Sequence, residues 1–300
     1  MKTSLFPFIA ITLLLASSCN ENAKKTVIQE TTEQSKSVVK VPNSWITSRV
    51  EKTRERLYSS DAGKVVWQAM EAHGGLDKWY QNGPISFRFN YQPLDGGTPR
   101  DTYQAIDTWR SKARHYQAKD STSQYGWDGK DAWVIAKDST VFPYNTRFWS
   151  LTPYFFAAQP FVLDGNGVNL ELLDQRTHNQ RKQDVIKVTF DEGTGDAPDD
   201  YYVLYFDSET HILSVIRYIV SYPGYFKDGG HLPEKFMELN GEQLADGISF
   251  PKEYKTHWLT EEELPGEHIT NITLSDIDFK SNLEDGFFKA PKGAKILKGL

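Results

Sequence analysis

The chain has 300 residues, with 34 Lys and Arg against 40 Asp and Glu, a formal net charge of −6 and one cysteine. This acidic balance argues against nucleic acid as a partner, because phosphate binding needs a basic face, and one cysteine excludes a disulfide within the chain. Aromatic residues make up 13% of the sequence and include eight Trp, which is typical of a sheet-rich fold with large side chains to bury or to offer to a ligand.

The N-terminal segment predicts export. An apolar run, LFPFIAITLLLA at residues 5–16, follows Lys2 and precedes three small residues. The run is shorter than the roughly 20 residues that a membrane-spanning helix needs. A basic, then apolar, then small-residue order is typical of a secretory signal peptide, so we expect a signal over residues 1–18.

Cys19 gives this signal a more specific interpretation. Small residues directly before it resemble the lipobox of bacterial lipoproteins, although Leu15 lies one position further from the cysteine than that pattern prefers. The resemblance implies that Cys19 carries acyl chains such as palmitate and anchors the mature protein to a membrane, since two chains give stable anchoring. An ordinary signal peptide with an incidental cysteine is the alternative.

Residues 19–42 are predicted to be a flexible tether. They are polar, mixed in charge and free of aromatic residues, so they cannot bury enough apolar area to offset the entropy of ordering. The folded domain is therefore expected over residues 43–300.

Two helices are predicted at the start of that domain. Asn43 or Ser44 caps SWITSRVEKTRERL. Ser60 or Asp61 caps AGKVVWQAMEAHGG, whose apolar residues form one helical stripe that ends at two glycines.

The pattern then changes to β-branched and aromatic strands. These are separated by turn residues such as Asp128-Gly129, read as a type I′ hairpin, and Asp246-Gly247. The segment 145–167 interrupts them with a short aromatic helix before Pro160. A helix with one apolar stripe buries that stripe against a sheet, so we expect a curved antiparallel sheet with helices on one face. The predicted strands are residues 85–92, 101–110, 112–118, 131–137, 184–190, 201–206, 211–222 and 248–258.

Five segments are also informative in their order along the chain. They are HGGLDKW followed by ISFRF, then YGWDGKDAWV, YYVLYFDSETHIL, DGISFPKEY and ITLSDIDFKSNLEDGFFKAPKGAKIL. Together, from about Asp61 to Leu297, they resemble the LolA/LolB-type lipoprotein-carrier superfamily. More closely, they are similar to an uncharacterised family of Gram-negative lipoproteins with that fold. The resemblance implies a mostly β fold with α, an unclosed LolA-like half-barrel of roughly ten antiparallel strands wrapped around helices.

The resemblance also implies a cavity for acyl chains or other hydrophobic ligands. The helical stripe and the strand alternation suggest which side chains face inward. As in the acceptor LolB, an apolar loop is expected at the membrane, here the Gly/Pro-rich loop 221–234 with Tyr225 and Phe226. The expected cavity residues are Trp67, Met70, Trp149, Phe155 and Phe156 on the helix side and Phe87, Phe89, Trp133 and Tyr205 on the sheet side.

The sequence shows no local motif for covalent chemistry. The sequence has no HExxH, GxSxG or Walker motif. His73 is expected to cap a helix, His115 and two other histidines to be half-exposed on strands, and His231 to be the least constrained. The acidic loop 191–200 is expected to be a solvated hairpin end, because its spacing does not match a calcium loop.

The first hypothesis is therefore a lipoprotein of the Gram-negative outer membrane, anchored at Cys19 and facing the periplasm. It binds a lipid or another hydrophobic small molecule, without a cofactor or covalent chemistry, in envelope lipid or lipoprotein handling. Two alternatives stay open. One is an anchored hydrolase that uses histidine and carboxylates at the mouth of the sheet, and the other is a structural or interaction lipoprotein with a filled core.

Overall fold

Thirteen strands form a single antiparallel sheet in the part of the chain that the computed structural model describes, residues 38–280 and 282–298. Cys19 and the predicted signal lie outside this range. The strand order is β13-β5-β4-β3-β2-β1-β12-β11-β10-β9-β8-β7-β6. The strands are β1 (Ile85–Pro93), β2 (Arg100–Asp107), β3 (Lys112–Gln117), β4 (Asp120–Trp127), β5 (Ala132–Ile135), β6 (Val168–His178), β7 (Arg181–Phe190), β8 (Tyr202–Asp207), β9 (Leu213–Tyr218), β10 (Lys235–Ala245), β11 (Ile248–Leu259), β12 (Pro265–Phe279) and β13 (Lys295–Leu297).

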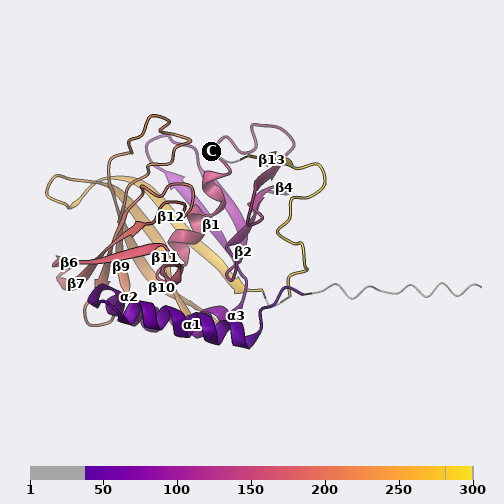
Figure 1. The fold of residues 1–300 in the computed structure, drawn as a ribbon. Coiled ribbons are helices and arrows are strands. Elements are labelled where there is room, and N and C mark those ends of the chain that lie inside the picture. The colour runs from indigo at the N-terminus through magenta and orange to yellow at the C-terminus, as the bar shows by residue number, and fades with distance from the viewer. Residues whose placement is uncertain (1–37, 281, 299–300) are drawn as a thin grey trace, which may run out of the picture. The chain divides into compact units, whose positions relative to one another are not determined.

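The sheet curves but does not close. Its edge strands, β6 and β13, stand at the two ends of the strand order and on opposite sides of the view in Figure 1. The predicted fold class, an unclosed antiparallel half-barrel wrapped around helices, is confirmed.

Three helices, not two, precede the sheet. They are α1 (Asn43–Tyr58), α2 (Asp61–Ala72) and α3 (Leu76–Asn82), and Figure 1 shows α1 along the lower edge of the sheet. The predicted cap of α2 is present, since the Ser60 side chain accepts a hydrogen bond from the Gly63 amide. The third helix restarts after Gly75, whose φ of 92° favours glycine, and was not predicted because it has only seven residues.

The predicted strands did not include β4, β6, β10, β12 and β13, and the omission of β6 and β10 has an identifiable reason. β6 is mostly exposed, so it shows little apolar alternation, and β10 reads KFMELNGEQLA, whose Glu, Gln and Leu are good helix formers. Of the two turns, Asp246 and Gly247 both have positive φ, 46° and 76°, as a type I′ turn requires. Asp128-Gly129 is not such a turn, because Trp127 pairs with Ala132 across a four-residue loop.

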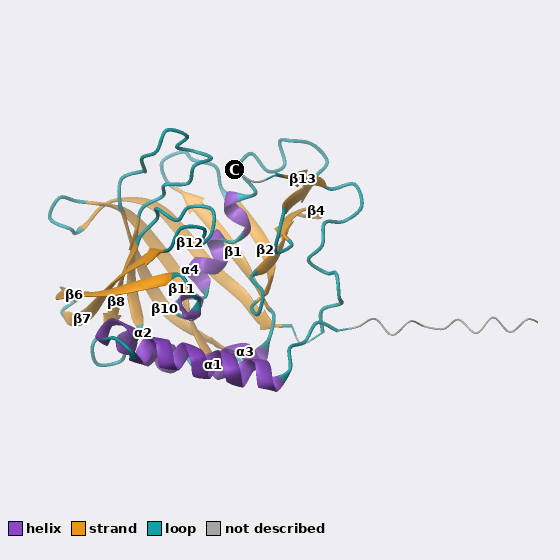
Figure 2. Ribbon diagram, in the orientation of Figure 1, coloured by secondary structure: helices purple, strands orange, loops and turns teal. Residues whose placement is uncertain are grey.

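A short helical segment occupies the concave face of the sheet. It contains η1 (Phe148–Ser150), α4 (Thr152–Ala157) and η2 (Phe161–Asp164), as the interruption before Pro160 predicted. Figure 2 shows α4 inside the curve of the sheet. One apolar core joins α2, α3, this segment and the inward strand residues. No helix in the described part of the chain is both long and apolar enough to cross a membrane.

Candidate ligand-binding cavity

A cavity of about 640 Å³ lies between the segment 148–168 and the concave face of β8 and β9. Its volume falls in the range of about 300–1,000 Å³ that is typical of ligand pockets. The loops 191–200 and 219–234 complete the wall. Tyr225 and Leu232 in the second loop are 46% and 38% exposed, so this side opens to solvent.

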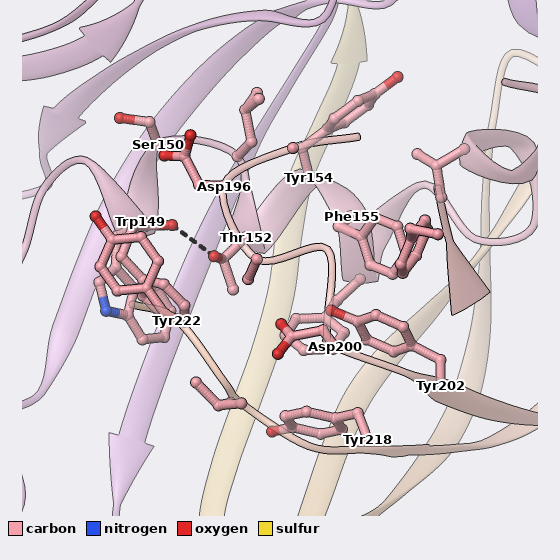
Figure 3. A pocket seen from close by; sticks show the side chains of 18 of the residues that line it. Trp149, Ser150, Thr152, Tyr154, Phe155, Asp196, Asp200, Tyr202, Tyr218 and Tyr222 are labelled. Carbon is pink, nitrogen blue, oxygen red and sulfur yellow. Dashed lines mark hydrogen bonds between the residues drawn. The ribbon is translucent and has the colours of Figure 1, made fainter. Parts of the chain in front are cut away.

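Aromatic side chains from two layers line the cavity. Tyr202 on β8 pairs in register with Tyr218 on β9, so both rings lie on the same face of the sheet, where they stack at 6.1 Å between centroids. From α4, Phe155 lies 4.6 Å from the Tyr202 ring and Phe156 lies 5.1 Å from the Tyr218 ring. Figure 3 shows Phe155, Tyr202 and Tyr218 around the space. The cavity therefore presents an apolar surface on both sides.

Buried polar contacts hold the helical segment in place. His115 on β3 is fully buried, and its Nε2 lies 2.8 Å from the Ser150 carbonyl oxygen, next to the cavity residue Trp149. Burial lowers the pKa of His115 to about 4, so the ring is neutral near pH 7 and Nε2 donates this bond. The expectation of a half-exposed His115 was wrong. At the other end of the segment, Arg49 Nε on α1 donates to Asp164 Oδ2 at 2.6 Å.

An ion pair joins two parts of the cavity wall. Arg147, before η1, makes two hydrogen bonds of 2.7 and 2.8 Å to the Asp196 carboxylate in the loop 191–200. Both residues line the cavity. The acidic loop therefore folds back on the helical segment, rather than ending as a freely solvated hairpin.

Two more ionisable residues line the cavity near Tyr218. Asp200 is buried, which raises its pKa, and its Oδ1 accepts hydrogen bonds from the Ser221 amide and hydroxyl at 2.6 and 2.8 Å. Lys235, the first residue of β10, is 9% exposed. Burial lowers its pKa to about 8, against the opposing effect of the Asp200 charge.

Four of the nine predicted cavity residues line this space, namely Phe89, Trp149, Phe155 and Phe156. The other five lie elsewhere. Trp67 and Met70 on α2 and Phe87 on β1 are buried in the main apolar core of the domain. Trp133 donates a hydrogen bond to the Phe288 carbonyl at 3.2 Å.

Tyr205 lies on the outer face of the sheet, because strand alternation places Tyr202 and not Tyr205 inward. An error of one residue in the phase of a strand moves a side chain to the opposite face. Of the predicted membrane-contact residues, Tyr225 lines the cavity and packs 5.2 Å from the Phe148 ring, and Phe226 is half-buried.

The polar lining was missed by sequence reasoning. Arg100, Arg147 and Lys235 come from separate strands and loops, and no local motif joins them. One signal was present, since Lys235 follows a Gly/Pro-rich loop and directly precedes the apolar residues Phe236 and Met237.

The histidines considered for catalysis have structural contacts. His73 is 4% exposed, its Nδ1 lies 2.7 Å from the Ala69 carbonyl oxygen, and burial lowers its pKa. His231 is exposed, with Nδ1 2.7 Å from the Leu232 carbonyl oxygen. Within the described residues, no group of three or more His, Cys, Asp or Glu side chains is arranged to hold a metal ion.

No family model and no curated protein matches this sequence. Among solved structures, the chain is similar to a LolA superfamily protein from Nitrosomonas europaea, at 12% identity and a TM-score of 0.49, over 76% of this chain and 97% of that one. It is also similar to a DUF1329 family protein from Desulfovibrio piger, at 12% identity and a TM-score of 0.49, over 75% of this chain and 97% of that one.

A third similar structure is a domain assigned to an outer membrane lipoprotein-sorting protein from Vibrio parahaemolyticus, at 11% identity and a TM-score of 0.43, over 73% of this chain and 97% of that one. At such identities the likeness concerns the fold alone. The class that the fold and the site define is an open antiparallel half-barrel with an apolar cavity under a short helix.

Proposed function

We propose that this chain is a membrane-anchored lipoprotein that binds a lipid or another hydrophobic ligand in the cavity under α4. The observation that carries the proposal is a space of about 640 Å³ with aromatic side chains from both α4 and the sheet in its wall. A filled core would leave no such space, and a hydrophobic ligand that enters from the open side buries apolar surface of this wall. This argues against the purely structural alternative.

The proposal includes a place in the cell. The signal-like segment and the small residues before Cys19 support a lipid anchor, and we place the protein at the outer membrane, facing the periplasm, in envelope lipid or lipoprotein handling. Tyr225, at the open side of the cavity, and its neighbour Phe226 are proposed to contact the membrane during ligand entry. No covalent step is part of the proposal.

Ligand binding is tested by filling the cavity. The full chain carrying Cys19→Ser is titrated with the neutral fluorescent probe N-phenyl-1-naphthylamine, with and without Val168→Trp. Val168 is the first residue of β6 and lines the cavity. We expect Val168→Trp to weaken probe binding about tenfold, because the indole occupies the space of the ligand.

Leu172→Trp is the matched control, because it makes a similar change on the same strand at a residue that is 46% exposed. It should leave probe binding unchanged. Equal probe affinity in the Val168→Trp and Leu172→Trp variants, or no probe binding by the unsubstituted chain, contradicts the proposed function.

The anchor is tested separately. Cys19 is the single thiol of the chain, so Cys19→Ser should abolish labelling by radioactive palmitate and move the protein from the membrane fraction to the soluble fraction. A variant that stays in the membrane fraction as before contradicts the anchor but leaves the cavity proposal intact.

A further inference from the structure

Lys235 is a buried cation without an acceptor. Its side chain lines the cavity at the start of β10, and no described residue accepts a hydrogen bond from Nζ. Nζ lies 5.5 Å from the centroid of the Tyr218 ring and 4.8 Å from that of the Trp258 ring. Lysine is rarely buried unless its charge is paired, so this ammonium group calls for an anion that the protein does not supply.

Asp200 is the acidic lining residue whose charge acts on Lys235. The two groups form no ion pair within 4.0 Å among those found between described residues. One oxygen of Asp200 is already occupied by both donors of Ser221. Because the lowered pKa of Lys235, about 8, is still above 7, the amine is mostly protonated and positively charged at pH 7.

The charged residues that line the cavity carry a net positive charge, the same sign as Lys235. Three cations and two carboxylates line it, although the chain as a whole has a formal net charge of −6. Arg147 is neutralised by Asp196. Arg100 lies over the Trp149 ring at 4.1 Å and donates to the Thr98 carbonyl at 3.0 Å. Arg100 Nε is also buried without an acceptor among the described residues, but Lys235 is the lining cation that makes no hydrogen bond and no ion pair within the described part of the chain.

We propose that the ligand is an anionic amphiphile whose acidic headgroup binds Lys235 while its apolar chain lies among Phe155, Phe156 and the rings of Tyr202 and Tyr218. The inference rests on the proposed function and names the ligand class. A fatty acid carboxylate and a lysolipid phosphate share this chemistry. We expect the carboxylate to bind more tightly, because Asp200 repels the second charge of a phosphate.

The test compares ligands that differ only in their headgroup. Laurate, dodecyl phosphate and neutral dodecanol are titrated calorimetrically, below their micelle concentrations, into the full chain carrying Cys19→Ser. We expect laurate to bind about tenfold more tightly than dodecanol, the preference that a hydrogen bond to a charged group supports. Acetate and inorganic phosphate, which lack the chain, should not bind measurably.

The variants assign this preference to Lys235. Lys235→Met should remove the preference for laurate and leave dodecanol affinity within about twofold, whereas Lys235→Arg should retain the preference. Lys187→Met is the matched control, because Lys187 lies on β7 outside the cavity lining. The comparison of laurate with dodecanol can be made in the Cys19→Ser chain that retains Lys235. It therefore remains a valid test even if Lys235→Met fails to fold.

The outcomes separate this inference from the proposed function. Equal binding of laurate and dodecanol, or an unchanged preference in Lys235→Met, overturns the headgroup inference and leaves hydrophobic binding intact. Binding of none of the three amphiphiles overturns the proposed function itself. Tighter binding of dodecyl phosphate than laurate supports the acidic headgroup and overturns the preference for a carboxylate.

Discussion

Arg217 and Lys235 lie on neighbouring strands, β9 and β10, and face opposite sides of the sheet. Arg217 is 6% exposed on the outer face and has three partners: Glu234 at 2.8 Å, Glu263 at 3.2 Å and the Tyr205 hydroxyl at 3.1 Å. Lys235 is 9% exposed on the inner face and has no hydrogen-bond acceptor among the described residues, only the rings of Tyr218 and Trp258. Arg217 and Lys235 are therefore buried to a similar extent, but only Arg217 is paired with carboxylates.

The apolar surroundings differ in the same sense. The outer face around Arg217 carries a small packed cluster of Val185, Val203, Tyr205, Val215 and Phe236. The inner face around Lys235 carries a larger set of aromatic side chains that line the cavity. On the outer face, packing and ion pairs stabilise the fold. On the inner face, apolar surface and the charge of Lys235 remain free to bind a ligand. Unsatisfied groups in a folded protein are expected at functional sites.

The strongest test of this contrast is Arg217→Met. It leaves Glu234, whose side chain is 15% exposed, without its ion pair. Removing one partner of a buried pair is strongly destabilising. Because Glu263 is 39% exposed and partly screened, we expect a loss of about 3 kcal/mol in the free energy of unfolding, measured by urea denaturation at pH 7. A loss below about 1 kcal/mol contradicts the structural role of the outer face.

A second test uses pH at the inner face. The pKa of buried His115 falls from 6.5 to about 4 on folding, so the unfolded chain binds the proton more readily between these values. Stability is full above pH 6.5 and falls as the pH is lowered toward 4. From pH 7 to pH 5 we expect His115 to account for about 2 kcal/mol of lost unfolding free energy.

His115→Gln keeps a donor for the Ser150 carbonyl and removes the titration. It should therefore flatten the fall in stability between pH 7 and pH 5, whereas His231→Gln, at an exposed residue, should not. An identical pH dependence in His115→Gln and the unsubstituted chain means that His115 is not held neutral by burial.

Lys235→Met should change the free energy of unfolding in the opposite direction to Arg217→Met. Replacing a buried ammonium without an acceptor by an apolar side chain of similar length should raise the unfolding free energy by about 1 kcal/mol in the ligand-free protein. Urea denaturation of delipidated protein measures the change. A clear loss of stability shows that Lys235 is already paired without a ligand.

The smallest expected change in stability is at the mouth of the cavity. Asp196 is 37% exposed in its pair with Arg147, which is 11% exposed. Asn keeps an amide oxygen that can accept a hydrogen bond from the Arg147 guanidinium, so Asp196→Asn should lower the unfolding free energy by only about 0.5 kcal/mol. It should still speed release of N-phenyl-1-naphthylamine about threefold in stopped-flow measurements, because the pair joins two parts of the wall. An unchanged release rate would mean that the Arg147–Asp196 pair does not control how fast the probe leaves the cavity.

The sequence predicted the fold better than the site. Two-residue alternation and helical stripes are local, so the half-barrel class, the first two helices and the aromatic helix before Pro160 were all predictable. The strand β10 was not, because its helix-forming residues adopt a strand only through pairing with β9 and β11. The turn at Asp128 was misread because the loop length depends on how β4 and β5 pair.

Prediction of the site failed where three-dimensional proximity decides. Phe155 and Phe156 were identified by their clustering in one segment, but the phase of β8 was misjudged by one residue, which exchanged Tyr205 for Tyr202. Lys235 and Asp200 are separated by 35 positions along the chain. Asp200 lies in the loop before β8, and the register of β8, β9 and β10 brings this loop near the start of β10.

The central claim is that an anionic amphiphile occupies the cavity, and the most direct test is to identify what the protein carries. The full chain carrying Cys19→Ser is purified without detergent beside its Val168→Trp variant, and extracted lipids are identified and quantified by mass spectrometry. The account predicts about one acidic lipid per chain in the first protein and a strong depletion in the variant. Equal amounts of the same lipids in both proteins, or only neutral lipids in the first, would contradict it.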